Sequence, residues 1–231
     1  MKSIFRKKTS QLENQKGNNS EEKAYRHIRA ETSDLHLKIS DFLGSHKTVE
    51  QAAKALRLLV GKTIVMEDEN DMGYMMDFSI YEAKIGAQTA IQYFYDYGPE
   101  LSAKEDQYLA DLLENHVSLF EIVAINPKNH TADLKDLLNE GKIYTITDVA
   151  LSGQKNQIRP LIFTRIFTFD NMSMTAGATM AFSPADGPEM IKRLSLQQFT
   201  KRRKLNSTEL YLFFYNLFRS IGIEVRTEEN Y

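Results

Sequence analysis

The stretch LIFTRIFTFDNMSMTAGATMAF, residues 161 to 182, decides the predicted fold of this 231-residue chain. Up to Phe169 the bulky residues recur at every second position, which is the period of a β-strand. One face of this strand would carry Leu161, Phe163, Arg165, Phe167 and Phe169. Asp170 and Asn171 follow, and both residue types tolerate the positive φ angles of a two-residue turn. Small and apolar residues then alternate with polar ones over residues 172 to 182, so the stretch predicts an antiparallel hairpin.

The strand pattern begins well before this hairpin. Residues 117 to 125, VSLFEIVAI, are mostly β-branched, aromatic or apolar, and NPKN at 126 to 129 is typical of a turn. Pro184 and Pro188 end the pattern, because proline cannot donate to a strand ladder. Residues 116 to 184 therefore predict an antiparallel meander of four or five strands, which can curl into a partial barrel.

The flanking segments have the spacing of helices. One helix face is formed by Tyr25, Ile28, Thr32, Leu35, Ile39 and Phe42. Gly44 is predicted to end this helix. Further helix starts are predicted by capping pairs, in which a side-chain oxygen and a residue three positions later satisfy free N–H groups. These pairs are Thr48 with Gln51, Ser79 with Glu82, Ser102 with Glu105, and Asn206 with Glu209. The helix after Ser79 would end at Gly98, and the last two helices are predicted near 188 to 199 and 207 to 220.

The order of helices, strands and helices argues for an α+β protein rather than an alternating α/β sheet. Residues 1 to 20 are rich in Lys, Asn, Gln and Ser and predict a disordered tail. A helical region at 21 to 115, the meander at 116 to 184 and C-terminal helices at 185 to 231, packed on the meander, follow. Because no Pro/Gly-rich linker separates them, residues 21 to 231 are expected to form one continuous unit.

Composition excludes several classes of function. The net charge of -2 gives no overall attraction to nucleic acid or to an anionic membrane. The absence of cysteine excludes disulfides, thiol nucleophiles and cysteine-built metal sites, and it fits a reducing cytosol. The N-terminus has no apolar segment of a secretory signal, and no run approaches the roughly 20 apolar residues that span a bilayer. We therefore expect a cytoplasmic protein without a membrane partner.

Two loops resemble ligand-binding motifs without completing them. LRLLVGKT, 56 to 63, ends like a phosphate-binding loop, but a leucine replaces its first glycine and a helix precedes it, so Gly61 is predicted to end that helix. EDENDMG, 67 to 73, contains four carboxylates, but Met72 and Ser79 stand where a calcium loop requires oxygen ligands. An acidic, solvated loop is predicted.

Residues 129 to 148, NHTADLKDLLNEGKIYTITD, allow two interpretations. A helix ending at Gly141 would bring His130, Asp133 and Asp136 to one face, like ligands for a metal. Two strands joined by a turn would instead be scaffold, with Asp133 pointing away from the other two residues. The alternation of Tyr and Ile with Thr after the turn favours strands, so no metal ligand is assigned unless 131 to 138 is helical.

Basic residues gather in two short runs. The stronger run consists of Lys201, Arg202, Arg203 and Lys204, and the weaker one consists of Arg6, Lys7 and Lys8. Either run can contact phosphates. The aromatic residues of the β region follow the core period instead of forming an exposed stacking surface. Nucleic-acid binding through the two runs is therefore an alternative hypothesis.

No catalytic or cofactor-binding residue is predicted. The five histidines lack the paired spacing of a helical zinc site, and no Gly-x-Ser-x-Gly elbow is present. Carboxylates are plentiful, but a pair that acts as acid and base must be close together and differently buried, which a sequence does not show. An enzyme with an unidentified site stays a third hypothesis.

Residues 106 to 184 resemble a segment of uncharacterised bacterial proteins that often carry a SEC-C zinc motif elsewhere in the chain. The shared pattern consists of a short helix, a strand, an Asp-Leu-Leu turn with glycine, and an Arg-containing strand paired with a small-residue strand. In this sequence the pattern is carried by Asp136, Leu137, Leu138, Gly141, Asp148, Arg165 and Gly177. The cysteines of the zinc motif are absent, so the resemblance implies the β assignment but no zinc-dependent role.

The leading hypothesis is a non-catalytic bacterial interaction or regulatory module, with a second copy or another protein as partner. It is motivated by the missing catalytic signatures and by apolar helix faces wider than one packing seam, especially in the last helix at 207 to 220.

Overall fold

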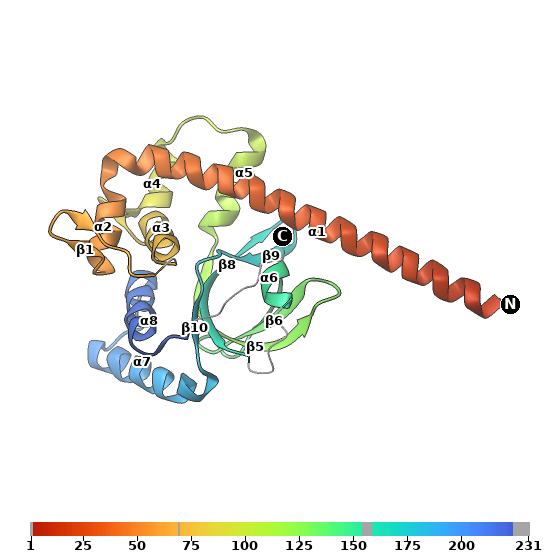
Figure 1. The fold of residues 1–231 in the computed structure, drawn as a ribbon. Coiled ribbons are helices and arrows are strands. Elements are labelled where there is room, and N and C mark those ends of the chain that lie inside the picture. Colours follow the sequence, from red (N-terminus) through yellow and green to blue (C-terminus); the bar gives the residue numbers. More distant parts are fainter. Residues whose placement is uncertain (1, 69, 154–158, 224–231) are drawn as a thin grey trace.

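The computed structural model describes residues 2–68, 70–153 and 159–223, and it contains a group of helices beside a curled antiparallel sheet (Figure 1). The helices are α1 (Lys2–Leu43), η1 (Gly44–His46), α2 (Thr48–Ala55), α3 (Asp71–Tyr81), α4 (Ala90–Tyr97), α5 (Ala103–Leu113), α6 (Val149–Ser152), η2 (Pro184–Asp186), α7 (Gly187–Lys201) and α8 (Ser207–Ile221). The strands are β1 (Leu59–Val60), β2 (Thr63–Ile64), β3 (Lys84–Ile85), β4 (Gln88–Thr89), β5 (His116–Asn126), β6 (Thr131–Asp136), β7 (Ile143–Thr147), β8 (Leu161–Phe169), β9 (Met172–Thr175) and β10 (Met180–Phe182). The α+β prediction is confirmed.

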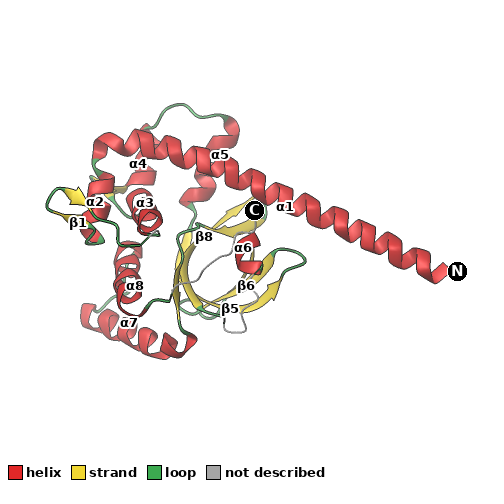
Figure 2. Cartoon of the chain, in the orientation of Figure 1, coloured by secondary structure: helices red, strands yellow, loops and turns green. Residues whose placement is uncertain are grey.

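The main sheet is antiparallel and has the order β10-β8-β5-β6-β7, with β9 also paired to β8. Strands β5, β6 and β7 form a meander, and the chain then crosses to the other side of β5 before it enters β8. The sheet curves strongly (Figure 2). Strand β7 comes near β9, but no pairing among the described residues closes the sheet into a barrel. The expected curl is therefore present in a sheet of six strands.

The hairpin that decided the prediction is present, with one difference. Asp170 and Asn171 have φ angles of 46° and 76° and form its turn. The return strand is not continuous: β9 pairs with the second half of β8 and β10 pairs with the first half. Ala176 still donates its backbone N–H to Arg165 of β8 at 2.9 Å, and residues 177–179 after it lie outside both strands. Gly177 lies in this interruption with a φ of 92°, which an L side chain adopts only with strain. Small residues with little strand preference explain why the ladder breaks here.

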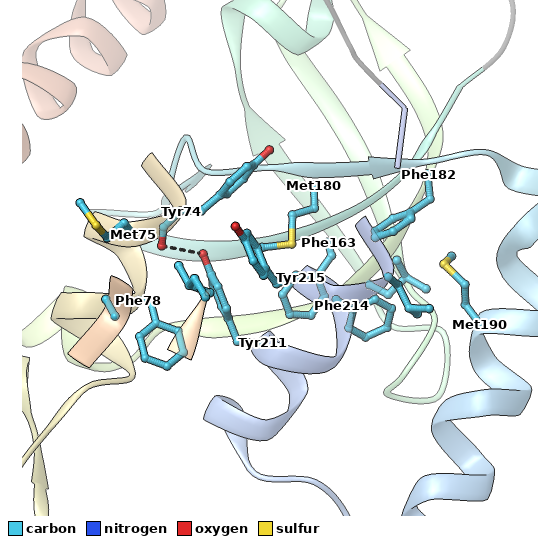
Figure 3. Close-up of a cluster of buried hydrophobic side chains, with 14 of the residues drawn as sticks. Tyr74, Met75, Phe78, Phe163, Met180, Phe182, Met190, Tyr211, Phe214 and Tyr215 are labelled. Atoms are coloured by element: carbon cyan, nitrogen blue, oxygen red, sulfur yellow. Dashed lines mark hydrogen bonds between the residues drawn. The ribbon is translucent and has the colours of Figure 1, made fainter. Parts of the chain in front are cut away.

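Strand β8 supplies side chains to each of three hydrophobic clusters. Its helix-facing residues pack in two groups: Leu161 and Phe163 lie against α7 and α8, and Phe167 and Phe169 lie against α1, α4 and α5. Figure 3 shows the first group, in which Phe163 stacks on Phe214 of α8 at a ring distance of 4.4 Å. The other face of β8 lines the inside of the curled sheet. Both the α7–α8 pair and the N-terminal helices therefore pack on one strand, as predicted for the C-terminal helices.

Helix α1 is longer than predicted. It ends at Leu43 before Gly44, as expected, and it begins at Lys2, within the segment of residues 1 to 20 for which the sequence predicts a disordered tail. Figure 1 shows this part projecting away from the rest of the chain. Lys, Gln and Glu are good helix formers, and a helix that is already nucleated by packing at residues 25–43 is extended at little free-energy cost.

Two of the four capping pairs are confirmed, because Ser102 with Glu105 and Asn206 with Glu209 form complete capping boxes. The helix predicted from Ser79 to Gly98 is wrong in its first half, whereas its second half is present as α4 and ends at Gly98 as predicted. Ser79 lies in the last turn of α3, and the chain then forms the β3–β4 hairpin, whose turn contains Gly86 with a φ of 62°. Thr89 caps the next helix.

The pair of Thr48 and Gln51 is also not a cap. The residue before α2 is Lys47 in the left-handed conformation, and it makes no side-chain cap. Gln51 instead bonds the backbone of Lys84 and ties α2 to the β3–β4 hairpin. Helix α2 nevertheless begins at Thr48, so the predicted helix start is confirmed although the predicted cap is not formed.

The two loops also differ from their predictions. Helix α2 ends at Ala55, and Gly61, with a φ of 63°, lies in the turn between β1 and β2 rather than at a helix end. Within the acidic loop, Asp71 is fully buried. Its carboxylate accepts hydrogen bonds from the backbone N–H groups of Glu67 and Asp68, and it forms an ion pair with Arg219 of α8. The loop is therefore attached to α8 through Asp71, while Glu67 and Asn70 are exposed, as the prediction of a solvated loop requires.

Candidate functional site

The segment 129–148 forms two strands, β6 and β7, and its acidic side chains do not converge. Asp133 faces the outer side and accepts a hydrogen bond from Thr145 at 2.6 Å, whereas Asp136 is fully buried on the opposite side. His130 precedes β6 with a φ of 53° and lies 3.5 Å from Glu22 of α1. The described residues contain no cluster of His, Cys, Asp and Glu that fits a metal ion. The strand interpretation is confirmed.

Asp136 organises the turn between these strands. Its Oδ1 accepts hydrogen bonds from the backbone N–H groups of Leu138 and Asn139 and from the Ser118 hydroxyl, which lies 2.6 Å away. Its Oδ2 bonds His116 at 2.6 Å and the Asn139 amide at 2.9 Å. Burial raises the pKa of this carboxyl, but these hydrogen bonds outweigh burial and hold the pKa well below its usual range. The Asp-Leu-Leu pattern is thus the signature of a turn.

Asp148 has a corresponding role at the end of β7. It caps α6, and its Oδ2 accepts a hydrogen bond from the Thr175 hydroxyl of β9 at 2.9 Å. Arg29 of α1 donates to the same hydroxyl at 3.4 Å. Asp148 and Thr175 therefore join the rim of the sheet to helix α1.

Arg165 lies at the centre of a buried polar network. Its side chain is 2% exposed. It donates to Asp77 of α3 through Nε and Nη2, both at 3.3 Å, to Glu82 at 2.6 Å, and also to Asn115. The guanidinium carbon lies 4.4 Å from the ring centre of Tyr81. The one charged side chain on the apolar face of β8 is therefore bound by partners from α3 and from the connection that follows it.

The network continues into α8. Glu82 also accepts hydrogen bonds from the hydroxyls of Ser207 at 2.6 Å and Thr208 at 3.0 Å, in the first turn of that helix. Two carboxylates thus surround one guanidinium, which leaves one negative charge in excess among these three groups. Burial raises the pKa of the Asp77 carboxyl, although the Arg165 charge opposes that rise. Of the two carboxylates, Asp77 makes the longer contacts with Arg165, 3.3 Å against 2.6 Å for Glu82.

A cavity of about 380 Å³ opens beside Asp77. It is bordered by α1, by α3 and by the interruption between β9 and β10. The lining residues are His36, Leu37, Ser40, Asn70, Gly73, Tyr74, Met76, Asp77, Ile80, Tyr81, Ala176, Gly177, Ala178 and Thr179. A hypothetical Cβ on Gly177 would meet nothing within 4 Å, which agrees with open space at this point. The break in the return strand therefore forms one wall of the cavity.

The polar groups of the cavity come from elements far apart in the sequence. His36 of α1 and the hydroxyl of Tyr81 at the end of α3 form a hydrogen bond of 2.7 Å. Burial lowers the pKa of His36 and raises that of Tyr81, so both rings are neutral near pH 7. The sequence interpretation did not select these residues or Asp77. The available signal was a lone carboxylate inside the apolar run YMMDFSIY, 74 to 81.

The predicted basic run lies at the end of α7 and in the turn to α8. Lys201 and Arg203 both pair with Glu209, with distances of 2.7 Å and 2.6 Å. Arg202 ends α7 in the left-handed conformation, and Lys204 follows in the turn. All four side chains are exposed, and within the described part of the chain Arg202 and Lys204 have no ion-pair partner. Arg6, Lys7 and Lys8 lie in α1, but their side chains are outside the described residues.

Helix α7 exposes two large apolar side chains next to this basic run. Phe199 is 81% exposed and Leu196 is 65% exposed. They are three residues apart and share one face with Lys192, which is also exposed. We call Lys192, Leu196 and Phe199, together with Arg202 and Lys204, the α7 strip. Its opposite face packs against the sheet and α8 through Met190 and Leu194.

Comparisons with known proteins give one match. The model of a family of unknown function (DUF7986) matches residues 19–228, which is most of the chain. No curated protein and no solved structure gives a significant match. None of the described helices is both long and apolar enough to cross a membrane. By the extent of the family match, the chain belongs to this family of unknown function.

Proposed function

We propose that the protein is a non-catalytic interaction module that binds an acidic amphipathic helix of a partner protein on the α7 strip. The observation that carries the proposal is the exposure of Phe199 and Leu196 on one helix face. Large apolar side chains that stand together on a surface are typical of interaction sites. The proposal also assigns the protein to the bacterial cytoplasm, in line with the missing cysteines and with the resemblance of residues 106–184 to bacterial proteins.

The positive charges around Leu196 and Phe199 indicate an acidic partner. Lys192 precedes the pair on the same face, and Arg202 and Lys204 follow it, so cations flank the apolar centre at both ends. A helix with Leu or Met at positions i, i+3 and i+7 and with Glu or Asp on its flanks matches this arrangement in shape and charge. A helical partner is favoured because Lys192, Leu196 and Phe199 lie along one face of helix α7, against which a second helix can pack.

Nucleic acid is the second candidate, and the exposed ring of Phe199 beside a basic run favours it. Two features weigh against it. Glu209 pairs with both Lys201 and Arg203 and offsets one of their two charges, and Leu196 offers no ring for base stacking. If single-stranded nucleic acid is the ligand, changing Arg202 and Lys204 together to Gln will reduce binding and its salt dependence more than the same change at Lys201 and Arg203.

The first test uses a fluorescent helical peptide of about 20 residues with apolar residues at the positions above and Glu on both flanks. We expect F199S to weaken its binding about tenfold or more, since burial of one large apolar side chain contributes about 1.5–3 kcal/mol. L196S should have a similar effect. Fluorescence anisotropy at several salt concentrations measures both the affinity and its electrostatic part.

The matched control is V60S, because Val60 is 65% exposed, like Leu196, but lies in the β1–β2 hairpin. It should leave the affinity unchanged. A scrambled peptide of the same composition, which cannot place its apolar residues on one face, should bind at least about tenfold more weakly. Equal binding of the two peptides, or no binding of the designed peptide to the wild-type protein, would refute the proposal.

A further inference from the structure

The cavity beside Asp77 has the chemistry of a binding site that is separate from the α7 strip. Its volume of about 380 Å³ is within the range of small-molecule pockets, about 300–1,000 Å³. Tyr74, Tyr81, Leu37 and Ile80 provide aromatic and aliphatic walls. Its polar groups come from three separate parts of the chain, α1, the segment of α3, and the interruption between β9 and β10, and they converge on one space, as in a ligand site.

The residues that line the cavity include one carboxylate and no lysine or arginine. Of the lining residues, Asp77 alone carries a formal charge, because His36 is neutral and the others are polar or apolar. Asp77 belongs to a buried network of two carboxylates and one guanidinium, whose other members are Glu82 and Arg165. Glu82 and Arg165 do not line the cavity, so the excess negative charge can be reached from the cavity only at Asp77.

Asp77 also has room for another hydrogen-bond donor. Both of its contacts with Arg165 are long, at 3.3 Å, whereas Glu82 binds the same guanidinium at 2.6 Å. A charge-assisted hydrogen bond between N–H and a carboxylate is typically about 2.7–2.9 Å long, so the guanidinium satisfies Glu82 better than Asp77. A cation in the cavity would complete the coordination of Asp77 and balance the network.

We infer that this cavity binds a small organic cation, an ammonium group on an apolar or aromatic body, with Asp77 accepting from the ammonium. The rings of Tyr74 and Tyr81 are placed to contact the apolar body or the cationic head. An anionic ligand is excluded from the site because it would add a third negative charge to a buried network that already has an excess.

Calorimetric titration of the wild-type protein with methylammonium, butylammonium and benzylammonium tests the inference. Butylammonium or benzylammonium should bind saturably with one site per chain, and benzyl alcohol and benzoate, which have the same ring without the positive charge, should bind at least about tenfold more weakly. If none of the three cations binds, or if benzyl alcohol binds as well as benzylammonium, the inference is wrong.

Leu37 provides a matched pair of variants that does not disturb the buried network. Its side chain is 64% exposed at the rim of the cavity, so a charge is tolerated there. L37E should strengthen benzylammonium binding about threefold and L37K should weaken it about threefold, as expected for one charge added at a solvent-exposed position several ångströms away. Benzoate should show the opposite order.

D77N should abolish ammonium binding because it removes the acceptor charge. Circular dichroism shows whether D77N retains the fold. If D77N does not fold, the L37E and L37K variants decide whether the cation binds in this cavity. Cation binding that is unchanged in both Leu37 variants would place the bound cation elsewhere and overturn the inference. Binding of the acidic peptide to the α7 strip should be unaffected by all of these changes, so the two proposals can fail separately.

Discussion

Replacement of Arg165 by Met is expected to lower the free energy of unfolding by about 3–5 kcal/mol, the largest effect of any single substitution proposed for this protein. Met retains much of the apolar volume of the arginine stem but removes the cation. Asp77 and Glu82 would then remain buried beside each other without a counter-ion. Urea unfolding at pH 7, followed by circular dichroism, measures the difference from wild type.

The control is R193M, which breaks an exposed ion pair with Glu189 whose two side chains are each 55% exposed. Such pairs contribute about 0–1 kcal/mol, so this variant should unfold nearly like wild type. A loss of less than about 1 kcal/mol for R165M would mean that the network is not held together by the guanidinium.

The pH dependence of R165M gives a second, independent readout. Burial and the neighbouring Glu82 carboxylate raise the folded-state pKa of Asp77, and without the opposing charge of the guanidinium this pKa lies still further above the unfolded value of about 4. The folded state then binds more protons than the unfolded state, so stability increases as the pH falls from 7 toward 4. Adding D77N and E82Q to R165M removes the unpaired charges and should recover a large part of the loss at pH 7.

For the Arg165 network, the sequence predicts the local strand but not the partners of the arginine. The alternation over residues 161–169 predicts the face on which Arg165 lies, and the hairpin turn at Asp170 is confirmed. The partners of Arg165 are 88 and 83 residues away, and no local pattern connects them. Glu82 was moreover interpreted as part of a helix cap, a role it would have had only if the chain did not turn back into the β3–β4 hairpin.

The cavity and the α7 strip were not predictable for a related reason. The helix near 188–199 was predicted and is confirmed, but which of its faces is covered depends on how α8 and the sheet pack against it. Likewise, one wall of the cavity exists because the return strand breaks at Gly177, where simple alternation predicts a continuous strand. Local periodicity determines elements, whereas sites arise where elements with long sequence separation meet.

The second large effect is expected for Asp136→Ala, which should lower the free energy of unfolding by about 3 kcal/mol. The substitution leaves the backbone N–H groups of Leu138 and Asn139 and the Ser118 hydroxyl without their acceptor, in a turn that is partly or fully buried. Each unsatisfied buried donor costs about 1–3 kcal/mol, and only part of that is recovered when water enters. Urea unfolding at pH 7 measures the loss.

Asp133→Ala is the matched control, because Asp133 is in the same strand but points to the opposite side, where its bond to Thr145 is exposed. Its removal should change stability by less than about 1 kcal/mol. If the two aspartates shared a metal site, both substitutions would destabilise the metal-loaded protein alike, so unequal effects also test the strand interpretation.

The effect of Asp136→Ala should decrease in acid. The hydrogen bonds to the Asp136 carboxylate hold its folded-state pKa well below the value of about 4 in the unfolded chain. A depressed carboxyl pKa contributes stability that is complete above the unfolded pKa and is lost as the pH falls toward the folded one. The difference in unfolding free energy between wild type and variant should therefore be constant from pH 7 to about pH 5 and shrink steadily below that. A difference that stays the same down to pH 3 would show that the neutral side chain is sufficient for the turn, and that the charge of Asp136 contributes nothing to it.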